Sequence, residues 1–473
     1  MRLTQGATSL ATLAWLAGCA AGPDYKPPTP PPGAAAPFVA VQSSASTTAA
    51  PPNAWWKLYD DPVLNSLIAR AFTANEDLKT AEANLASARA ILEGARSNLF
   101  YPQTQVELAG VYGRDPTFNE ILELTGRKPQ TTWLFDSLFD MSYELDLFGH
   151  VRRSIEAARD NREAVEAARD DLRVTIAAET ARAYGQICTF GEEIAVARQS
   201  LALVTQQEKI IEQRRDAGAG STFDVVRSQV LVAQVRATIP PLEGQRRAAL
   251  FELTALLGAT PSNAPVTVDS CVAPPRLATL MPVGDGAALL RRRPDIREAD
   301  RKLATALAEI GVATADLFPR VSLSGFYGGA NTQISTLTAN SGLVWGVGPS
   351  ISWTFPNMSG PLARLAQANA NAAASLSNFN SVVLQALKET EQALATYNAE
   401  LDHHAALATA MAEAKEAFGL AQDEFNAGRI SNLDLLTSEQ TLVDANAALA
   451  GSDAALVQDQ IAVFKALGGG WQT

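Results

Sequence analysis

Two segments of this chain, each close to 70 residues long, have compositions that favour one uninterrupted helix. Residues 149–216 contain no proline, residues 362–427 contain none after Pro361, and both segments are rich in alanine and in glutamate or glutamine. An α-helix rises ~1.5 Å per residue, so a helix of some 65 residues is about 100 Å long. A compact domain cannot contain such a helix, and we therefore expect a coiled coil or an elongated barrel of helices.

The two long segments belong to an internal duplication. Recurring motifs stand in the same order, 210 to 218 residues apart: Leu99-Phe100-Tyr101-Pro102 and Leu317-Phe318-Pro319; Gly110-Val111-Tyr112-Gly113 and Gly325-Phe326-Tyr327-Gly328; Ala217-Gly218, Ser221, Asp224 and Ala427-Gly428, Ser431, Asp434. A unit of this length is too long for a solenoid of short repeats. We expect two equivalent halves at 56–257 and 285–473, joined by a proline-rich connector at 258–284.

Each half is predicted to contain a helix, two strands and two long helices. The strand signal is alternation, as in 139–148, where aromatic and aliphatic side chains alternate with acids and serine. A soluble sandwich would show the same alternation. Strands of about ten residues also match the length that crosses an outer membrane when tilted.

Four strands cannot close a barrel, and an open edge in lipid leaves backbone groups unpaired. Other copies of the chain would have to complete the sheet, and twelve strands from three copies would enclose a water-filled pore. The acids on the polar faces of the strands would then point into the pore and favour cations. These predicted lumen acids are Glu107, Asp140, Glu144 and Asp146.

The N-terminus is predicted to be a targeting segment. Residues 1–18 are a short apolar leader that cannot span a bilayer, and Leu16-Ala17-Gly18-Cys19 resembles the bacterial lipobox. The resemblance implies lipidation of Cys19 with three acyl chains (a diacylglyceryl group and a palmitate), enough for stable anchoring. An ordinary cleavage site with a chance cysteine is the alternative. Residues 19–55 are rich in proline and are expected to be an extended tether without a packed core.

The composition excludes several functions. A net charge of −12 and a pI of about 4.9 argue against nucleic-acid binding, which needs a basic surface. The adjacent His403 and His404 would diverge on a helix and could not share a metal. Neither Gly-x-Ser-x-Gly nor His-Glu-x-x-His occurs in the sequence. We expect neither enzyme activity nor a cofactor or metal.

Together these features resemble the outer membrane factor family of TolC-like channels, especially its lipidated efflux branch (NodT-like, of RND-type systems). The stretches 143–149 (YELDLFG) and 290–297 (LRRRPDIR) are similar to family signatures. The resemblance implies an α+β membrane protein, a homotrimer whose twelve-stranded β-barrel continues into a long periplasmic α-helical barrel. It implies a passive exit duct in the outer membrane for drugs or other small molecules, and hence antibiotic resistance. The partners would be a periplasmic adaptor (membrane fusion) protein and an inner-membrane pump. The alternatives are a channel for type I protein secretion and a periplasmic coiled-coil scaffold without a pore.

The resemblance also suggests where the partners and the gate lie. Glycine-rich tips end the long helices, and capping-box signals open the return helices. The predicted adaptor-docking residues are Gly218, Ser221, Gly428 and Ser431, although the serines would cap helices whatever else they do. The predicted periplasmic gate comprises Leu420, Asp423 and Glu424, where ordinary surface acids are the alternative for the two carboxylates.

Two further expectations concern the disulfide and a loop. The periplasm is oxidising, so Cys188 on a long helix and Cys271 on the connector could form a disulfide, with two buried thiols as the alternative. The first half has the longer inter-strand segment, at 114–132. We expect this loop to face the outside of the cell, because outer-membrane barrels place their longer loops there.

Overall fold

The chain folds into two compact units, each described here by itself. The computed structural model describes residues 20–42, 44–114, 116–268, 270–277, 279–337 and 342–471. The first unit, here called the sheet unit, comprises the residues up to Pro28 together with Asn84–Val165 and Glu298–Phe379. The second, the hairpin unit, comprises Thr29–Ala83, Glu166–Arg297 and Asn380–Thr473.

The main helices and strands occur in the same order in the two halves of the chain. The helices and strands are β1 (Ser46–Thr47), η1 (Trp55–Tyr59), α2 (Pro62–Ala74), α3 (Glu76–Phe100), β2 (Gln103–Gly113), α4 (Pro116–Leu124), β3 (Thr132–Leu145), α5 (His150–Asp216), α6 (Thr222–Leu256), η2 (Pro261–Asn263), η3 (Val266–Val268), β4 (Met281–Pro282), α7 (Gly286–Arg292), α8 (Pro294–Ala315), β5 (Arg320–Asn331), η4 (Ile334–Thr336), β6 (Leu343–Ser352), α9 (Ser359–Asn426) and α10 (Asn432–Ala466). Among the helices of the described residues, none combines the length and the apolar character that crossing a membrane requires.

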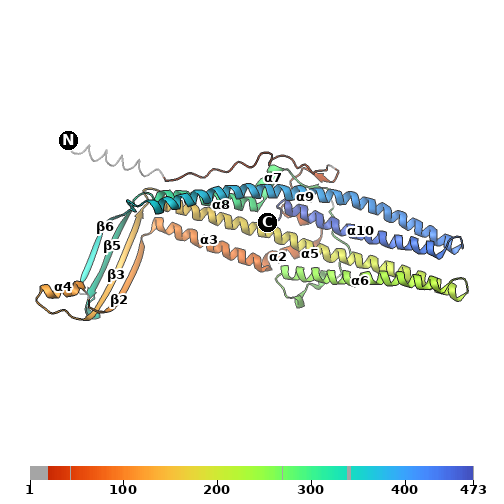
Figure 1. Ribbon diagram of the computed structural model, residues 1–473, viewed down its shortest axis with the longest axis horizontal. Helices are drawn as coiled ribbons and strands as arrows, with labels where there is room; N and C mark the ends of the chain where they lie inside the picture. The colour runs from red at the N-terminus through yellow and green to blue at the C-terminus, as the bar shows by residue number, and fades with distance from the viewer. Residues whose placement is uncertain are drawn as a thin grey trace. The chain divides into compact units, whose positions relative to one another are not determined.

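The sheet unit contains one antiparallel sheet in the order β2-β3-β5-β6, so each half of the chain supplies two neighbouring strands. Figure 1 shows the four strands side by side. Partners across the ladders follow the expected alternation, because Gln105 lies opposite Asp140 and Ser322 lies opposite Ser350. Strands β2 and β6 are the two edges of the sheet in this chain.

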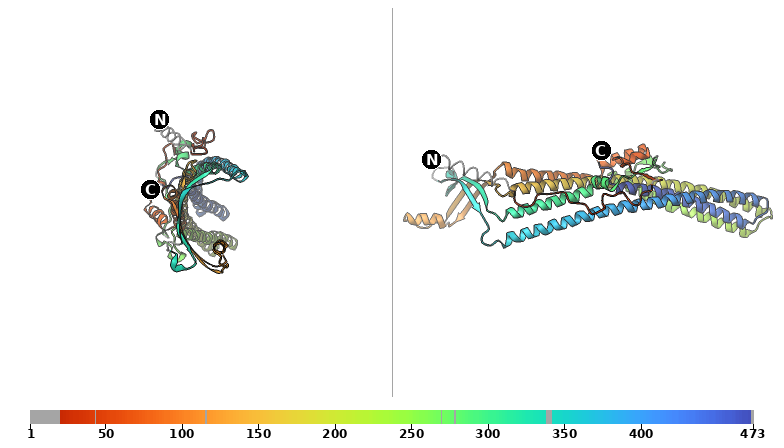
Figure 2. Two further views of the ribbon diagram at one scale, coloured as in Figure 1. Left: turned by 90° about the vertical axis from the view of Figure 1, so that its left-hand side faces the viewer. Right: turned by 90° about the horizontal axis from the view of Figure 1, so that it is seen from above.

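The hairpin unit contains two helical hairpins with the same turn geometry. Helix α5 and α6 form the first hairpin, α9 and α10 form the second, and Figure 2 shows both ending in turns at the same end of this unit. Gly218 and Gly428 adopt left-handed φ angles of +73° and +70°, which glycine tolerates and other residues rarely do. In each turn two amide groups return to the carbonyls of the last helical turn, as in a Schellman motif.

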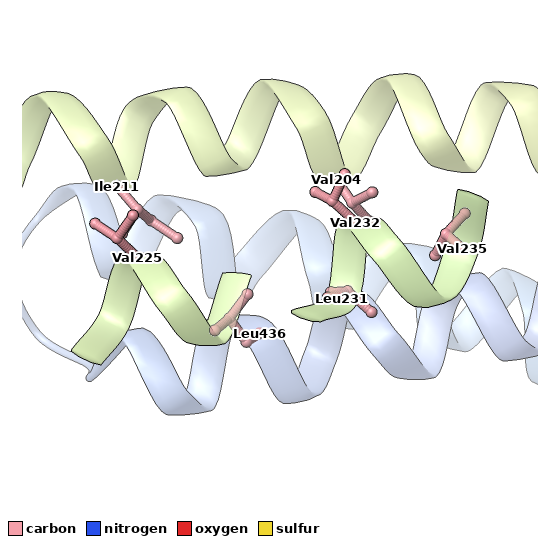
Figure 3. Packing of buried hydrophobic residues seen from close by; sticks show 7 residues of the cluster. All are labelled: Val204, Ile211, Val225, Leu231, Val232, Val235 and Leu436. Carbon is pink, nitrogen blue, oxygen red and sulfur yellow. The ribbon is translucent and has the colours of Figure 1, made fainter. Parts of the chain in front are cut away.

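Equivalent positions fill the cores of the two hairpins. Apolar residues of α5 and α6, together with Leu436 of α10, form one buried cluster (Figure 3). A second cluster joins residues of α9 to residues of α10. The core positions that correspond, 210 residues apart, are Val204 and Ala414, Ile211 and Ala421, Val225 and Leu435, and Val232 and Leu442.

The proline-rich N-terminal segment was expected to be an extended tether, but it contains turns near residues 31–36 and 42–46 and is bound to the rest of the unit. Ser46 and Thr47 form a short parallel strand pair with Met281 and Pro282. The Glu391 carboxylate accepts hydrogen bonds from two successive backbone amides of this segment, at 2.7 and 2.9 Å. A carboxylate more than 350 residues away satisfies these two amides, and composition cannot reveal that contact.

Candidate functional site

One face of the sheet gathers the predicted lumen acids. The ladder places Glu107, Asp140 and Glu144 on the same face, because Glu107 pairs with Leu138 and the even-numbered residues of β3 share one side. Asp136 lies on this face too and was missed, although the same alternation extended towards the start of β3 includes it. Serines of β5 and β6 continue the polar face, and Ser322 and Ser350 are hydrogen bonded at 2.9 Å.

Asp146 is a correction, because it lies beyond the end of β3. Its carboxylate accepts hydrogen bonds from the backbone amides of Val151 and Arg152 at 3.1 and 3.0 Å, and it forms an ion pair with the Arg152 side chain. The Asp146 side chain is only 9% exposed. A carboxylate at a helix N-terminus satisfies otherwise unpaired amides and the helix dipole. The prediction extended the alternation past the end of the strand, to a residue whose side chain instead binds amides at the N-terminus of α5.

The opposite face of the sheet is apolar and uncovered in the single chain. Its side chains include exposed residues from all four strands. They are Val106, Leu108, Tyr112, Trp133, Phe139, Leu145, Leu323, Tyr327, Trp345, Val347 and Ile351. A soluble monomer rarely exposes so large an apolar surface without a partner or a lipid phase to cover it.

The two hairpin tips carry the predicted docking residues in matching geometry. Ser221 and Ser431 each cap a helix, and in each capping box the serine and an aspartate bond one another's backbone amides. Hydrogen bonds from these serines lower the pKa values of Asp224 and Asp434. Asp224 also accepts a hydrogen bond from the Asn432 amide at 3.4 Å, which joins the two tips.

The predicted gate residues lie on the last turns of α9. Leu420 is 61% exposed, and Asp423 is exposed as well. Glu424 forms a two-pronged ion pair with Arg429 of the turn, with one hydrogen bond of 2.6 Å. That guanidinium lowers the pKa of Glu424. Arg429 was not among the predicted site residues, yet it lies five positions after Glu424 across a glycine turn, which is a signal that the sequence contains.

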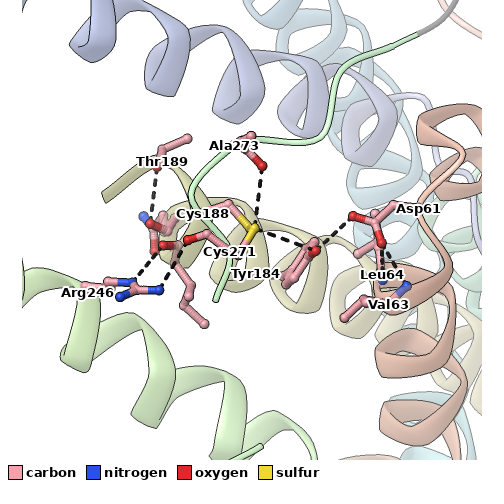
Figure 4. The surroundings of a disulfide bond; sticks show 11 residues. Asp61, Val63, Leu64, Tyr184, Cys188, Thr189, Arg246, Cys271 and Ala273 are labelled. Atoms are coloured by element: carbon pink, nitrogen blue, oxygen red, sulfur yellow. Dashed lines mark hydrogen bonds between the residues drawn. A yellow bond between two sulfur atoms is a disulfide. The ribbon is translucent and has the colours of Figure 1, made fainter. Parts of the chain in front are cut away.

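The connector is attached to α5 at its cysteine. Cys188 and Cys271 are joined by a disulfide, 83 residues apart in sequence (Figure 4). Arg246 of α6 donates hydrogen bonds to the backbone carbonyls of Ile187 and Cys271, each at 3.2 Å. Helix α5, helix α6 and the connector are therefore held together at one point.

The predicted lipidation site, Cys19, lies outside the described residues, but the chain just after it is docked. The Ala21 amide donates to the carbonyl of Phe148 at 3.0 Å, directly before α5 begins. Arg153 of α5 donates to the Ala21 carbonyl and pairs with Asp24 at 2.8 Å. Within the ranges that the structure describes, no cluster of His, Cys, Asp or Glu side chains could hold a metal ion.

Comparison with known proteins agrees with this geometry. A family model described as outer membrane efflux protein matches residues 67–259 and 287–469. The solved structure of the outer-membrane channel OprN is 34% identical, with a TM-score of 0.87 over 96% of this chain and 100% of that one. Nodulation protein T of Rhizobium leguminosarum bv. viciae is 27% identical over 460 residues, 96% of this chain and 92% of the relative. The toluene efflux pump outer membrane protein TtgC of Pseudomonas putida is 28% identical over 478 residues, 99% of this chain and 96% of the relative.

Proposed function

Since the chain belongs to the outer membrane efflux protein family and is an outer-membrane channel of an efflux system, we propose that three copies assemble into one passive exit duct. The observation that carries the proposal is the four-stranded sheet, which has two open edges and an uncovered apolar face. In lipid each unpaired backbone group costs several kcal/mol, so edges β2 and β6 must pair with edges of other copies. Twelve strands then close one barrel.

The polar face of the sheet would line the lumen of this barrel. A ring of three copies repeats Glu107, Asp136, Asp140 and Glu144 around the axis, and such acid rings attract cations. The apolar face would meet the lipid chains. The family and its OprN and TtgC relatives are channels or efflux components rather than enzymes, and the duct itself needs no chemistry.

The lipid anchor would lie where the strands meet the helices of the sheet unit. Ala21 and Asp24 are bound to Phe148 and Arg153 at the start of α5, so an acylated Cys19 two residues earlier would be held near this point. The end of the apolar face that lies next to the start of α5 and the acyl chains would then mark the same membrane surface. This agrees with an outer-membrane lipoprotein, the class to which the probable outer membrane lipoprotein SilC of Salmonella typhimurium belongs.

The helices of the three copies would form the periplasmic barrel, and the hairpin tips would meet the adaptor. Gly218, Ser221, Gly428 and Ser431 lie in the exposed turns, where a helical partner could approach the backbone closely. The Leu420, Asp423 and Glu424 rings would close the duct just above these tips. The inner-membrane pump supplies the energy, because the duct only connects the pump to the outside.

Conductance of the purified, lipidated protein in a planar bilayer tests this function. We expect stable channels whose reversal potential shows cation preference. Replacing Asp136, Asp140 and Glu144 together by asparagine or glutamine should weaken that preference, whereas the matched change Ser322→Ala on the same face should not. Absence of conductance from protein that remains trimeric would overturn the proposal.

A further inference from the structure

The seam between the two hairpins of one chain has an apolar part between α6 and α10. Leu231 and Val235 of α6 are buried in the same cluster as Leu436 of α10 (Figure 3). The partly buried Val443 packs against this cluster. Leu231 and Leu436 are each only 6% exposed. Within this seam, α6 therefore packs against the face of α10 that contains Leu436 and Val443.

Two polar contacts complete the seam. The Asn432 side-chain amide donates a hydrogen bond to Asp224 at 3.4 Å. The Arg214 guanidinium lies over the Phe425 ring, 4.2 Å from its centroid. These contacts join α6 to α10 and α5 to α9 near the tips.

The duplication places an equivalent of each seam residue 210 positions away, and among these equivalents Val226, Ala233 and Thr441 are exposed in the single chain. On the first hairpin, Val226 and Ala233 correspond to Leu436 and Val443. Val226 is 51% exposed, although its equivalent Leu436 is buried. Val230, on the same stripe of α6, is also exposed. The exposed Val226–Ala233 face of the first hairpin thus corresponds to the Leu436–Val443 face of the second hairpin, which packs against α6 within the chain.

The second hairpin carries the complementary surface. Thr441 and Ala445 of α10 correspond to Leu231 and Val235, and Thr441 is exposed whereas Leu231 is buried. We propose that the Thr441–Ala445 face of α10 packs against the Val226–Ala233 face of α6 in a second copy of this chain. The intrachain seam is then the template for the contact between copies, and the head-to-tail contact can close a ring.

The polar equivalents support this register because each remains a complementary pair. Thr222 takes the place of Asn432, and Asp434 takes the place of Asp224. A threonine hydroxyl can donate to a carboxylate as the asparagine amide does within the chain. In the proposed contact between copies, Thr222 of one copy would thus be the donor and Asp434 of the other copy the acceptor.

The cation–π pair becomes an ion pair in the second seam. Glu424 corresponds to Arg214, and Arg215 corresponds to Phe425, so Glu424 of one copy would meet Arg215 of a second copy. Both side chains are partly exposed in the single chain, where Arg215 pairs with its neighbour Asp216 and Glu424 pairs with Arg429. The second copy would therefore complete the candidate gate at Glu424.

This inference rests on the oligomer of the proposed function and adds the residues that join its copies. A cysteine pair tests the register: Val226→Cys with Thr441→Cys, treated with a short thiol cross-linker in membranes. The matched control is Leu231→Cys with Leu436→Cys, which occupies the equivalent positions inside one chain. The native Cys188 and Cys271 are already joined, so they do not compete.

We expect the Val226 and Thr441 pair to give covalent oligomers on a non-reducing denaturing gel, and the control pair to give only linked monomer. Charge reversal supplies a second measurement. Arg215→Glu and Glu424→Arg should each lower the fraction of oligomer that survives in detergent several-fold, and the double exchange should restore it. Arg429→Ala removes only the intrachain partner of Glu424 and should leave the oligomer intact.

Monomer alone from the Val226 and Thr441 pair, with the control pair linked and conductance retained, would overturn the register and leave the proposed function standing. Failure of the double charge exchange to restore the oligomer would overturn the pairing of Glu424 with Arg215. Absence of oligomer and conductance in the unmodified protein would instead count against the proposed function itself.

Discussion

The two hairpins share their turns and their core positions, yet they fill those positions in opposite ways. In the first hairpin, α5 supplies Val204 and Ile211 and α6 supplies valines. In the second, α9 supplies Ala414 and Ala421 at the matching positions, and α10 supplies Leu435 and Leu442. The smaller side chains on α9 are accompanied by larger ones on α10 and by two further buried residues of α9, Phe418 and Phe425, which together keep the interior close-packed. Duplication therefore fixed the backbone of the hairpin, while the side chains diverged.

The largest expected effect concerns these core pairs. Leu435→Ala should lower the free energy of unfolding by about 2–5 kcal/mol, because Leu435 is fully buried in the cluster between α9 and α10 and its truncation leaves a cavity there. The equivalent Val225→Ala should cost less, about 2 kcal/mol, because fewer buried methyl groups are lost. Urea unfolding in detergent, followed by circular dichroism, measures both. Equal losses would contradict the unequal division of volume.

The next effect comes from a position where the hairpins differ in charge. Glu439 of α10 is fully buried with neither carboxylate oxygen hydrogen bonded, whereas its equivalent on α6 is the exposed Gln229. Burial raises the pKa of Glu439 from 4.5 to about 7. Below about pH 4.5 the carboxyl is protonated in folded and unfolded chains alike. As the pH rises to about 7 the unfolded chain loses its proton first, so the free energy of unfolding falls by ~3 kcal/mol.

Glu439→Gln should remove this pH dependence. The amide resembles the protonated acid, so the variant should gain stability over the unmodified protein at pH 8.5 and gain little at pH 4. Gln229→Glu is the matched control, because an exposed carboxyl should change stability little at either pH. The same gain at both pH values would show that ionisation of Glu439 is not the cause.

The two capping boxes should respond alike, since their geometry is the same. Ser221→Ala and Ser431→Ala should each lower the free energy of unfolding by about 1 kcal/mol through loss of one cap. Aspartate also caps helices well, so Ser221→Asp and Ser431→Asp should retain most of the stability. Efflux assays on the alanine and aspartate variants then separate capping from docking. Lost efflux in the stable aspartate variants would indicate a contact with the adaptor.

The smallest effect on stability is expected at the exposed acids of α9. Asp423→Ala combined with Glu424→Ala should raise conductance and dye uptake, because contacts that hold the tips inward are lost. The double alanine variant also lacks the proposed ion pair with Arg215 but introduces no repulsion, so more of its oligomer should survive in detergent than that of Glu424→Arg. The first hairpin has Gln213 and Arg214 at these positions, so Gln213→Ala is the control without an acid. Conductance equal to that of the unmodified protein would remove the two acids from the gate.

Periodicity predicted the regular parts of the fold and failed at their ends. The alternation placed Glu107, Asp140 and Glu144 on one face because a strand has a side-chain period of two. It misplaced Asp146 because β3 ends at Leu145 and the next polar residue serves α5 instead. Helix α4 was not predicted within the long inter-strand segment, which was treated only as a loop.

Contacts between distant segments were beyond the sequence patterns. Nothing around Glu391 indicates that it binds amides of the N-terminal segment, since it resembles any other acid on a long helix. Glu439 likewise occupies a helical position typical of a surface acid, and only the folded structure reveals that it is buried. The equivalent position, Gln229, could not warn of this, because it remains exposed.

The disulfide gives the two hairpins different topologies. The bond between Cys188 and Cys271 closes a covalent loop that contains the C-terminal part of α5, the first tip and all of α6. Closing a loop of 83 residues removes enough entropy from the unfolded chain to stabilise the fold by about 4.5 kcal/mol in the chain-entropy model. A chain that enters the periplasm from its N-terminus presents both cysteines before any of α9 or α10 has arrived. The first hairpin can therefore be locked while the second half is still being exported, and it then offers a preformed surface on which α10 can pack.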